Sequence, residues 1–301
     1  MIEWVVTGAG GALGSVLMRM LSEQRKPAEG FVSREGPLPH VGKVSRVDLT
    51  DPRSYQERLF ALAPRVIVHL AGVSSIAGAF GDPERARAIN VEATAQLVAY
   101  SQALGARLLF ASTDLVFDGE AAPYGEDAAP EPATIYGLTK LEAECHVLTH
   151  KRGLVLRLPL LYGLPDVERA PTFFENLVSS LRAGRPVSLF EDEWRTPLWL
   201  DDAARACLAL GETELAGVLH LGGPERLSRF EMGERVAEAL HADAGLLRAA
   251  CRSQLQAPEP RARDVSLDNV RYQTEVGGPA GLTMRESLPH VFAHGPSRLL
   301  S

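Results

Sequence analysis

The chain has 301 residues, enough for one large domain or two modest ones. Hydrophobic residues make up 46% of it and charged residues 23%, which is typical of a globular protein with a substantial core. The formal net charge of −7 argues against nucleic acid or an anionic membrane surface as the main partner.

The N-terminus and the cysteines indicate the compartment. The opening "MIEWVVTGAG" lacks the basic start and apolar core of a secretory signal, and no stretch has the composition of a membrane span. Cys145, Cys207 and Cys251 show no metal-ligand spacing, and each falls in an apolar pattern with helical period. We therefore expect buried thiols, no metal site and a cytoplasmic protein.

The N-terminal half alternates between strand and helix patterns. Short apolar strands are predicted over residues 2–6, 29–33, 43–49, 65–72, 107–113 and 154–158. Helical spacing separates them at 13–21, 53–62, 83–100 and 135–150. This alternation predicts a parallel sheet covered on both faces, a Rossmann-type doubly wound α/β fold, over residues 1–160.

The pattern becomes less regular after Gly163. A helix is predicted over 172–183, a buried strand over 217–223 and an amphipathic helix over 228–241. We expect residues 161–301 to form mainly a small, discontinuous C-terminal substrate-binding lobe. Residues from about 197 to 223 are expected to return to the first domain.

A glycine-rich loop, "TGAGGALG", follows the first strand and opens the first helix. Glycines here allow a tight turn and let backbone N–H groups approach a pyrophosphate at the positive end of the helix. Such turns also occur for packing alone, but the position between strand and helix favours a dinucleotide. The predicted cofactor-binding residues of the loop are Gly8, Gly11, Ala12, Leu13 and Gly14.

The end of the second strand bears on the choice of cofactor. NAD-binding proteins usually have an acidic residue there, whereas an arginine accommodates the 2′-phosphate of NADP. The sequence "FVSREG" places Ser33 and Arg34 at this position, which favours NADP, while Glu35 leaves NAD open. Arg34 as a solvated loop cation is the alternative. Asp48, followed by Leu49, is predicted to meet the adenine or else to cap the turn at "TDP".

Tyr136 and Lys140 lie four residues apart on a predicted helix and so share one face. A free phenol has a pKa near ~10, and a nearby ammonium lowers it, so that the tyrosine can exchange a proton. Ser112 and Thr113 end the preceding strand, where ligands bind in such sheets. The alternative is a surface Tyr–Lys pair that stabilises the helix slightly.

These motifs together resemble the extended short-chain dehydrogenase/reductase superfamily. "HLAG", with Ala71 and Gly72, resembles its segment after the fourth strand, and "INVEAT" its helix with an asparagine. "STDLVFDGEAAPYGEDAAPEPATIYGLTKLEAE" and "HLGGPERLSRFEMGERVAEAL" resemble the dTDP-4-dehydrorhamnose reductase branch. The resemblance implies Thr113, Tyr136 and Lys140 as the catalytic residues, with NADP or NAD as cofactor.

The implied reaction is reduction of a sugar 4-keto group by hydride transfer, with Tyr136 as the proton donor. The implied substrate is a nucleotide-linked sugar, for which Ser112, Trp194 and Arg195 are candidate contacts. The last two alternatively only pack the second lobe, as part of "EWRTPLWL".

The segment "LRLPLLYG" departs from the reductase pattern and changes the residues expected beside the nicotinamide, Pro159, Leu160 and Leu161. It is closer to the regulatory β subunit of methionine adenosyltransferase, a related family that binds another protein. Three functions therefore remain open: a nucleotide-sugar reductase, a reductase of another carbonyl, and a cofactor-binding regulatory protein. A homodimer is a further alternative that the sequence leaves open.

Overall fold

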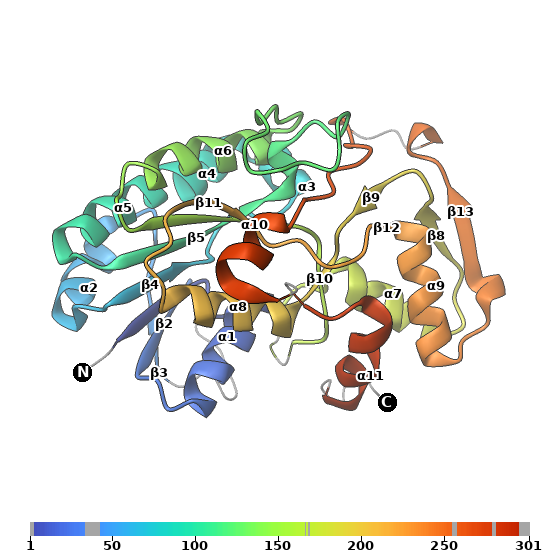
Figure 1. Ribbon diagram of the computed structural model, residues 1–301, viewed down its shortest axis with the longest axis horizontal. Coiled ribbons are helices and arrows are strands. Elements are labelled where there is room, and N and C mark those ends of the chain that lie inside the picture. The colour runs from blue at the N-terminus through green and yellow to red at the C-terminus, as the bar shows by residue number, and fades with distance from the viewer. Residues whose placement is uncertain are drawn as a thin grey trace.

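The computed structural model describes residues 3–33, 43–165, 167, 169–254, 258–278 and 281–294. Seven parallel strands form the central sheet, in the order β11-β6-β5-β4-β1-β2-β3 (Figure 1). They span Trp4–Thr7 (β1), Ala28–Val32 (β2), Lys43–Arg46 (β3), Val66–His69 (β4), Arg107–Thr113 (β5), Gly153–Leu158 (β6) and Gly217–His220 (β11). The predicted doubly wound α/β fold is confirmed.

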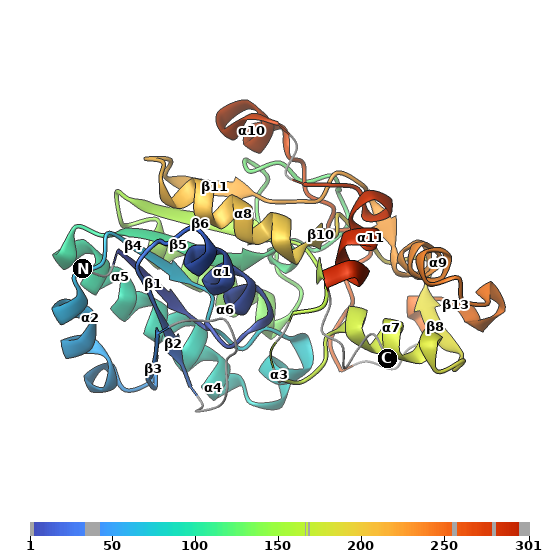
Figure 2. The same ribbon diagram turned by 90° about the horizontal axis from the view of Figure 1, so that it is seen from below.

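Helices cover both faces of this sheet (Figures 1 and 2). On one face lie α1 (Ala12–Glu23) and α8 (Leu200–Gly211), which pack against each other. On the other lie α2 (Gln56–Leu62), α5 (Ala93–Leu104) and α6 (Ile135–Val147). Two short helices, α3 (Ile76–Gly81) and α4 (Pro83–Arg87), follow β4 and pack near α6.

The alternating side chains of β1 show how the two faces are filled. Trp4 and Val6 belong to the core formed with α1 and α8, whereas Val5 belongs to the core on the opposite face. All three are fully buried. Because both faces are covered, the strand reads in sequence as one continuous apolar run.

The segment 83–100 was predicted as one helix, and this prediction is wrong in one respect. A π-helical turn, Ala88–Glu92, interrupts it between α4 and α5. The turn carries the buried side chain of Asn90. Single π turns within helices often occur at functional sites, where they reposition one side chain.

The rest of the chain forms a second region, seen beside the sheet in Figure 2. Its short strands pair as β8 with β13, β9 with β12, and β7 with β10. They span Leu161–Tyr162 (β7), Val187–Phe190 (β8), Trp194–Arg195 (β9), Leu198–Trp199 (β10), Leu227–Ser228 (β12) and Leu247–Ala250 (β13). Its helices are α7 (Phe173–Arg182), α9 (Arg229–Leu240) and α11 (Met284–His294), whereas the short α10 (Val270–Tyr272) lies against β11 of the central sheet.

Between these elements, α8 and β11 return to the sheet, where β11 pairs with β6. This is the part of the chain expected to return. The division into a cofactor-binding domain over 1–160 and a substrate-binding lobe stays a prediction.

The cysteines differ from the expectation of three buried thiols. Cys207 is buried in α8, but Cys145 is exposed on α6 and Cys251 is partly exposed after β13. The apolar pattern around Cys145 belongs to neighbouring residues on the inner face of the helix. Among the described residues, no helix is both long and apolar enough to cross a bilayer.

Candidate active site

The glycine loop joins β1 to α1 and lies against the end of β4. Gly8 has a φ of +70°, and a Cβ there would lie 2.7 Å from the backbone nitrogen of Ala71. A Cβ on Gly14 would lie 2.2 Å from the carbonyl oxygen of Gly8. Side chains at these positions would displace the loop. Helix α1 begins at Ala12, and Gly11 at its N-cap has no side chain to cap the first N–H groups.

A pocket of about 370 Å³ opens beside this loop. Its lining includes six residues predicted to bind the cofactor: Gly8, Ser33, Asp48, Leu49, Ala71 and Gly72. It also includes residues that the sequence did not single out: Phe31, Val32, Arg46, Val47, Val73, Arg85 and Ile89. Apolar walls with a few polar groups suit the adenosine part of a dinucleotide.

One of the groups predicted to select the cofactor, Ser33, lies at this pocket. Arg34 falls outside the described residues, and Ser33 is exposed at the pocket. Two other arginines, Arg46 and Arg85, line it. The Oδ1 atom of Asp48 accepts bonds from the backbone nitrogen and the hydroxyl of Thr50, at 2.9 and 2.7 Å, which hold the pKa of Asp48 below its usual range. Asp48 therefore stabilises its own turn while lining the pocket.

The three predicted catalytic residues come together at the carboxyl end of β5. Thr113 ends β5, and Tyr136 and Lys140 lie on successive turns of α6, which starts where Thr134 caps the backbone N–H of Gly137 at 3.1 Å. The Thr113 hydroxyl is close enough to Tyr136 to lower its pKa. Their exposed fractions are 8% for Tyr136 and 5% for both Thr113 and Lys140.

Burial raises the pKa of Tyr136 to about 12, and the neighbouring Thr113 hydroxyl only partly offsets this effect. The charge of Asp114 raises it further. A tyrosine in this state does not ionise near neutral pH without a cation beside it.

Lys140 is the predicted catalytic residue that reaches the pocket. Its Nζ lies 4.0 Å from the centroid of the Phe110 ring and 4.0 Å from the position of a Cβ on Gly72, which lines the pocket. Burial lowers the pKa of Lys140 to about 7, against the opposing charge of Glu144. Ligand groups that accept hydrogen bonds from the ammonium would favour its charged form.

Asn90 ties the loop after β4 to the active-site helix. Its Oδ1 accepts a bond from the nitrogen of Val73 at 2.8 Å, and its Nδ2 donates to the carbonyl of Val73 at 3.1 Å. The same Nδ2 donates to the hydroxyl of Thr139 at 3.0 Å. Thr139 lies between Tyr136 and Lys140, so the π turn fixes the orientation of the helix that carries them.

A buried polar chain continues from Asn90 to the glycine loop. The hydroxyl of Thr94 donates to the carbonyl of Asn90 at 2.7 Å and lies 2.9 Å from Nε2 of His69. The Nδ1 atom of His69 lies 2.6 Å from the hydroxyl of Thr7. Burial, together with the charge of Lys140, lowers the pKa of His69 to about 3, so its ring is neutral. The only sequence signal for this row of buried polar side chains was a histidine, His69, at the end of an otherwise apolar strand.

A buried ion pair lies below the catalytic residues. The guanidinium of Arg157 on β6 is 2.8 Å from the carboxylate of Glu144 on α6, and their side chains are 4% and 1% exposed. The hydroxyl of Ser112 donates to Glu144. Ser112, predicted as a substrate contact, is thus joined to this pair, whereas Thr113 is joined to Tyr136.

The second region reaches the site through Arg195, which is only 5% exposed. Its Nε lies 3.4 Å from Oδ2 of Asp114, the residue after Thr113. Trp194 is partly buried, and the guanidinium groups of Arg226 and Arg263 lie 4.5 and 6.0 Å from its ring. The structure therefore brings Arg195 beside Asp114, the neighbour of the predicted catalytic Thr113, while the ring of Trp194 packs near two arginines.

Glu193 is the centre of an arginine cluster that consists of Glu193, Arg195, Arg229 and Arg261. The carboxylate is fully buried and lies 3.4, 3.2 and 2.7 Å from the three guanidinium groups in that order. Burial opposes ionisation of Glu193, but the three positive charges outweigh it and hold its pKa below its usual range. No motif in the sequence indicated this cluster.

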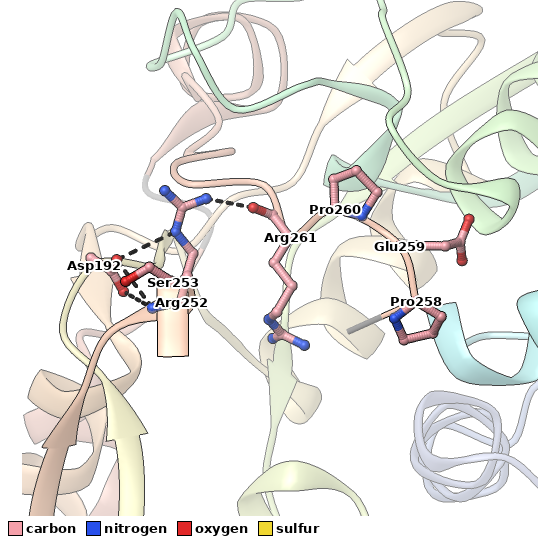
Figure 3. A pocket seen from close by; sticks show the side chains of 7 residues that line it. All are labelled: Asp192, Arg252, Ser253, Pro258, Glu259, Pro260 and Arg261. Atoms are coloured by element: carbon pink, nitrogen blue, oxygen red, sulfur yellow. Dashed lines mark hydrogen bonds and ion pairs between the residues drawn. The ribbon is translucent and has the colours of Figure 1, made fainter. Parts of the chain in front are cut away.

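A cleft of about 560 Å³ lies next to the cluster (Figure 3). It is lined by Asp192, Arg252, Ser253, Pro258, Glu259, Pro260 and Arg261. Figure 3 shows Arg252 turned toward Asp192 and Glu259 turned away from both. The Oε1 atom of Glu259 accepts a bond from the backbone nitrogen of Ile135 at 2.7 Å, at the start of α6. A wall of this cleft is therefore joined to the active-site helix.

The family model described as the RmlD substrate binding domain matches residues 2–295. The chain belongs to this family. It is 31% identical to methionine adenosyltransferase 2 subunit beta of Bos taurus, over 94% of this chain and 86% of that protein. It is also 31% identical to a probable low-salt glycan biosynthesis reductase of Haloferax volcanii, over 90% and 91%.

A solved structure of the same fold is the dTDP-4-dehydrorhamnose reductase of Bacillus anthracis in complex with NADP. It superimposes with a TM-score of 0.86 at 23% identity, over 97% of this chain and 99% of that one. The proteins similar to this chain thus include two that are named as reductases and one that is named as a subunit of methionine adenosyltransferase.

Proposed function

We propose that this protein is an NADPH-preferring reductase of a nucleotide-linked 4-keto sugar, of the dTDP-4-dehydrorhamnose reductase type. One observation carries the proposal: Thr113, Tyr136 and Lys140 are buried together, and Lys140 adjoins Gly72 of the cofactor pocket. The reductases of Haloferax volcanii and Bacillus anthracis support the same reaction class.

The residues present fit a dinucleotide. The uncapped start of α1 suits a pyrophosphate, and the adjoining pocket suits an adenosine. When bound, the reduced nicotinamide supplies the hydride. Gly11, Ala12, Leu13 and Gly14 would hold the phosphates, and Lys140 would hold the ribose.

The side chains of this protein supply the proton. Thr113 polarises the carbonyl, and Tyr136 donates its proton to the developing alkoxide. Lys140 stabilises the resulting phenolate, which burial alone disfavours. The nearby Asp114–Arg195 pair brings the second region to the same end of the sheet, where a sugar substrate would lie.

The test is incubation of the pure protein with dTDP-4-dehydrorhamnose and NADPH or NADH, followed by the absorbance of the reduced cofactor. Tyr136→Phe should lower kcat by about 10²–10⁴-fold, the usual contribution of general acid catalysis, and retain NADPH binding. Tight cofactor binding without turnover of any ketosugar would contradict the proposal. Turnover of a different class of carbonyl compound would keep the assignment as a reductase and reject a nucleotide sugar as the substrate.

Cofactor preference is tested separately at Arg46, which lines the adenosine pocket, and at Arg34, which the sequence predicts to meet a 2′-phosphate. Arg34→Ala and Arg46→Ala should weaken NADPH binding much more than NADH binding, because a 2′-phosphate is the only anionic group that distinguishes the two. Equal effects on both cofactors would show that these arginines do not select NADP.

A regulatory subunit is the second candidate function, and the segment that follows β6 favours it. Leu160 and Leu161 are partly buried against the core, so apolar side chains follow β6. The 31% identity with the adenosyltransferase beta subunit extends over 94% of this chain. Co-elution with a methionine adenosyltransferase catalytic subunit, unchanged by Tyr136→Phe, would support this candidate. A cytoplasmic location and a homodimer stay predictions from the sequence.

A further inference from the structure

Asp114 is a buried carboxyl group that directly follows Thr113 and is 3% exposed. Its Oδ1 accepts a bond from the Thr113 hydroxyl at 3.1 Å. Its Oδ2 receives no hydrogen bond from any described residue, and Nε of Arg195 lies 3.4 Å away. An ionised oxygen without a hydrogen-bond donor is costly in a buried site, and a protonated carboxyl avoids part of this cost.

The Thr113 hydroxyl lies between Asp114 and Tyr136. It is near enough to Tyr136 to lower the pKa of that side chain, and it accepts a bond from the backbone nitrogen of Leu115 at 3.2 Å. The Leu115 bond holds the oxygen in place and leaves its one hydrogen for either neighbour. A continuous row of neighbouring polar side chains thus runs through Asp114, Thr113 and Tyr136.

We propose that Asp114 is the proton reservoir of the site and restores the proton of Tyr136 through the Thr113 hydroxyl. This role rests on the proposed reductase function, in which Tyr136 becomes a phenolate once per turnover. The O–H bond of the Asp114 carboxyl breaks as Thr113 accepts that proton. Thr113 passes its own hydroxyl proton to the phenolate oxygen. One O–H bond forms for each that breaks, Thr113 is unchanged, and the Asp114 carboxylate later regains a proton from water.

The charged groups around Asp114 come from three elements. Arg195 on β9 and Arg229 at the start of α9 favour its carboxylate, and Glu193 before β9 opposes it. Tyr136 faces it from α6. Burial exceeds the effect of the arginines and raises the pKa of Asp114 to about 6. Charged residues of the second region therefore help to set the pKa of Asp114 and, with it, the ease with which Asp114 releases its proton.

The kinetic test uses Asp114→Asn in the full chain, with Asp127→Asn on the exposed loop as the matched control. At saturating ketosugar and NADPH, kcat of Asp114→Asn should fall about tenfold or more at pH 5, where the parent carboxyl is protonated, with cofactor affinity unchanged. The parent kcat should decline as pH rises through about 6, since the carboxylic acid is then lost, and this decline should be absent in the variant. An unchanged kcat and pH profile would overturn the proposal.

Arg195→Gln gives a second kinetic readout. Removing this cation raises the pKa of Asp114, so the decline of kcat should move to higher pH. A decline that stays in place, or moves to lower pH, would contradict the assignment. A merely structural role of Asp114 would not produce such a displacement.

A titration without substrate separates this proposal from the proposed function. Tyrosinate absorbance, taken as the difference from Tyr136→Phe, follows the ionisation of Tyr136. Because the negative charge of Asp114 raises the pKa of Tyr136, Asp114→Asn should ionise at lower pH, and Asp127→Asn should not. No shift would overturn the coupling. A shift in a protein that turns over no ketosugar would reject the proposed function and support the coupling.

Discussion

The two sides of the active site are constructed differently. On the side of the cofactor pocket, the arrangement is formed mainly by the polypeptide backbone. Gly8 and Gly14 allow the loop, the helix and the neighbouring strand to approach one another closely. On the side of the second region, charged side chains meet in the interior, and Glu193 holds three arginines. The first arrangement depends on the absence of side chains and the second on their charge balance.

This difference explains how each side responds to substitution. The glycine loop is formed by residues close together in sequence. One added methyl group therefore changes its backbone conformation without altering the charge of the protein. A buried charge cluster is assembled from distant segments and is balanced only when every member is present. Stability should therefore be more sensitive in the second region, and cofactor affinity more sensitive at the glycine loop.

The largest expected effect is at the centre of the arginine cluster. Glu193→Gln removes the counter-charge of three guanidinium groups and should lower the free energy of unfolding by about 3–5 kcal/mol, as for other broken buried ion pairs. Urea denaturation measures this loss. Glu142→Gln, which breaks the surface pair with Arg87 on a side chain that is 34% exposed, should cost less than about 1 kcal/mol. Equal losses would show that the cluster is not under electrostatic control.

The next effect is on cofactor affinity at the loop. Gly14→Ala places a methyl carbon 2.2 Å from the carbonyl oxygen of Gly8, so the backbone must shift. Since such overpacking costs about 1–3 kcal/mol, NADPH affinity should fall roughly ten- to a hundredfold, measured by fluorescence titration. Gly81→Ala is the matched control, because a Cβ there meets no atom within 4 Å. A normal affinity for Gly14→Ala would mean that the loop tolerates displacement.

The smallest effect is expected at Trp194, the predicted stacking partner of the substrate. Trp194→Ala should raise the KM for the nucleotide sugar by roughly fivefold or more, since aromatic stacking on a base contributes about 1–3 kcal/mol. NADPH affinity should stay unchanged, because the side chain belongs to the second region. Trp194→Phe keeps an aromatic face and should recover most of the loss. An unchanged KM in Trp194→Ala would contradict substrate stacking and show that the ring only packs against the neighbouring arginines.

The parallel sheet could be predicted because strands buried on both faces have continuous apolar runs, and all seven lie where the pattern placed them. The interruption of the helix at Ala88–Glu92 could not, because α-helical and π-helical turns have nearly the same residue preferences. The exposed thiol of Cys145 was also missed, since a pattern of apolar neighbours does not fix which face a single residue occupies.

The sequence by itself determined the elements whose chemistry is local: the glycine loop after β1, and a tyrosine one helical turn before a lysine. Spacing on a strand–loop–helix unit or on one helix face is enough to specify such features. Only the tertiary structure decided that Glu144 meets Arg157, that Arg195 meets Asp114, and that Glu193 holds an arginine cluster. Those contacts join residues from different segments, and their charges are balanced only after the chain has folded and removed them from water.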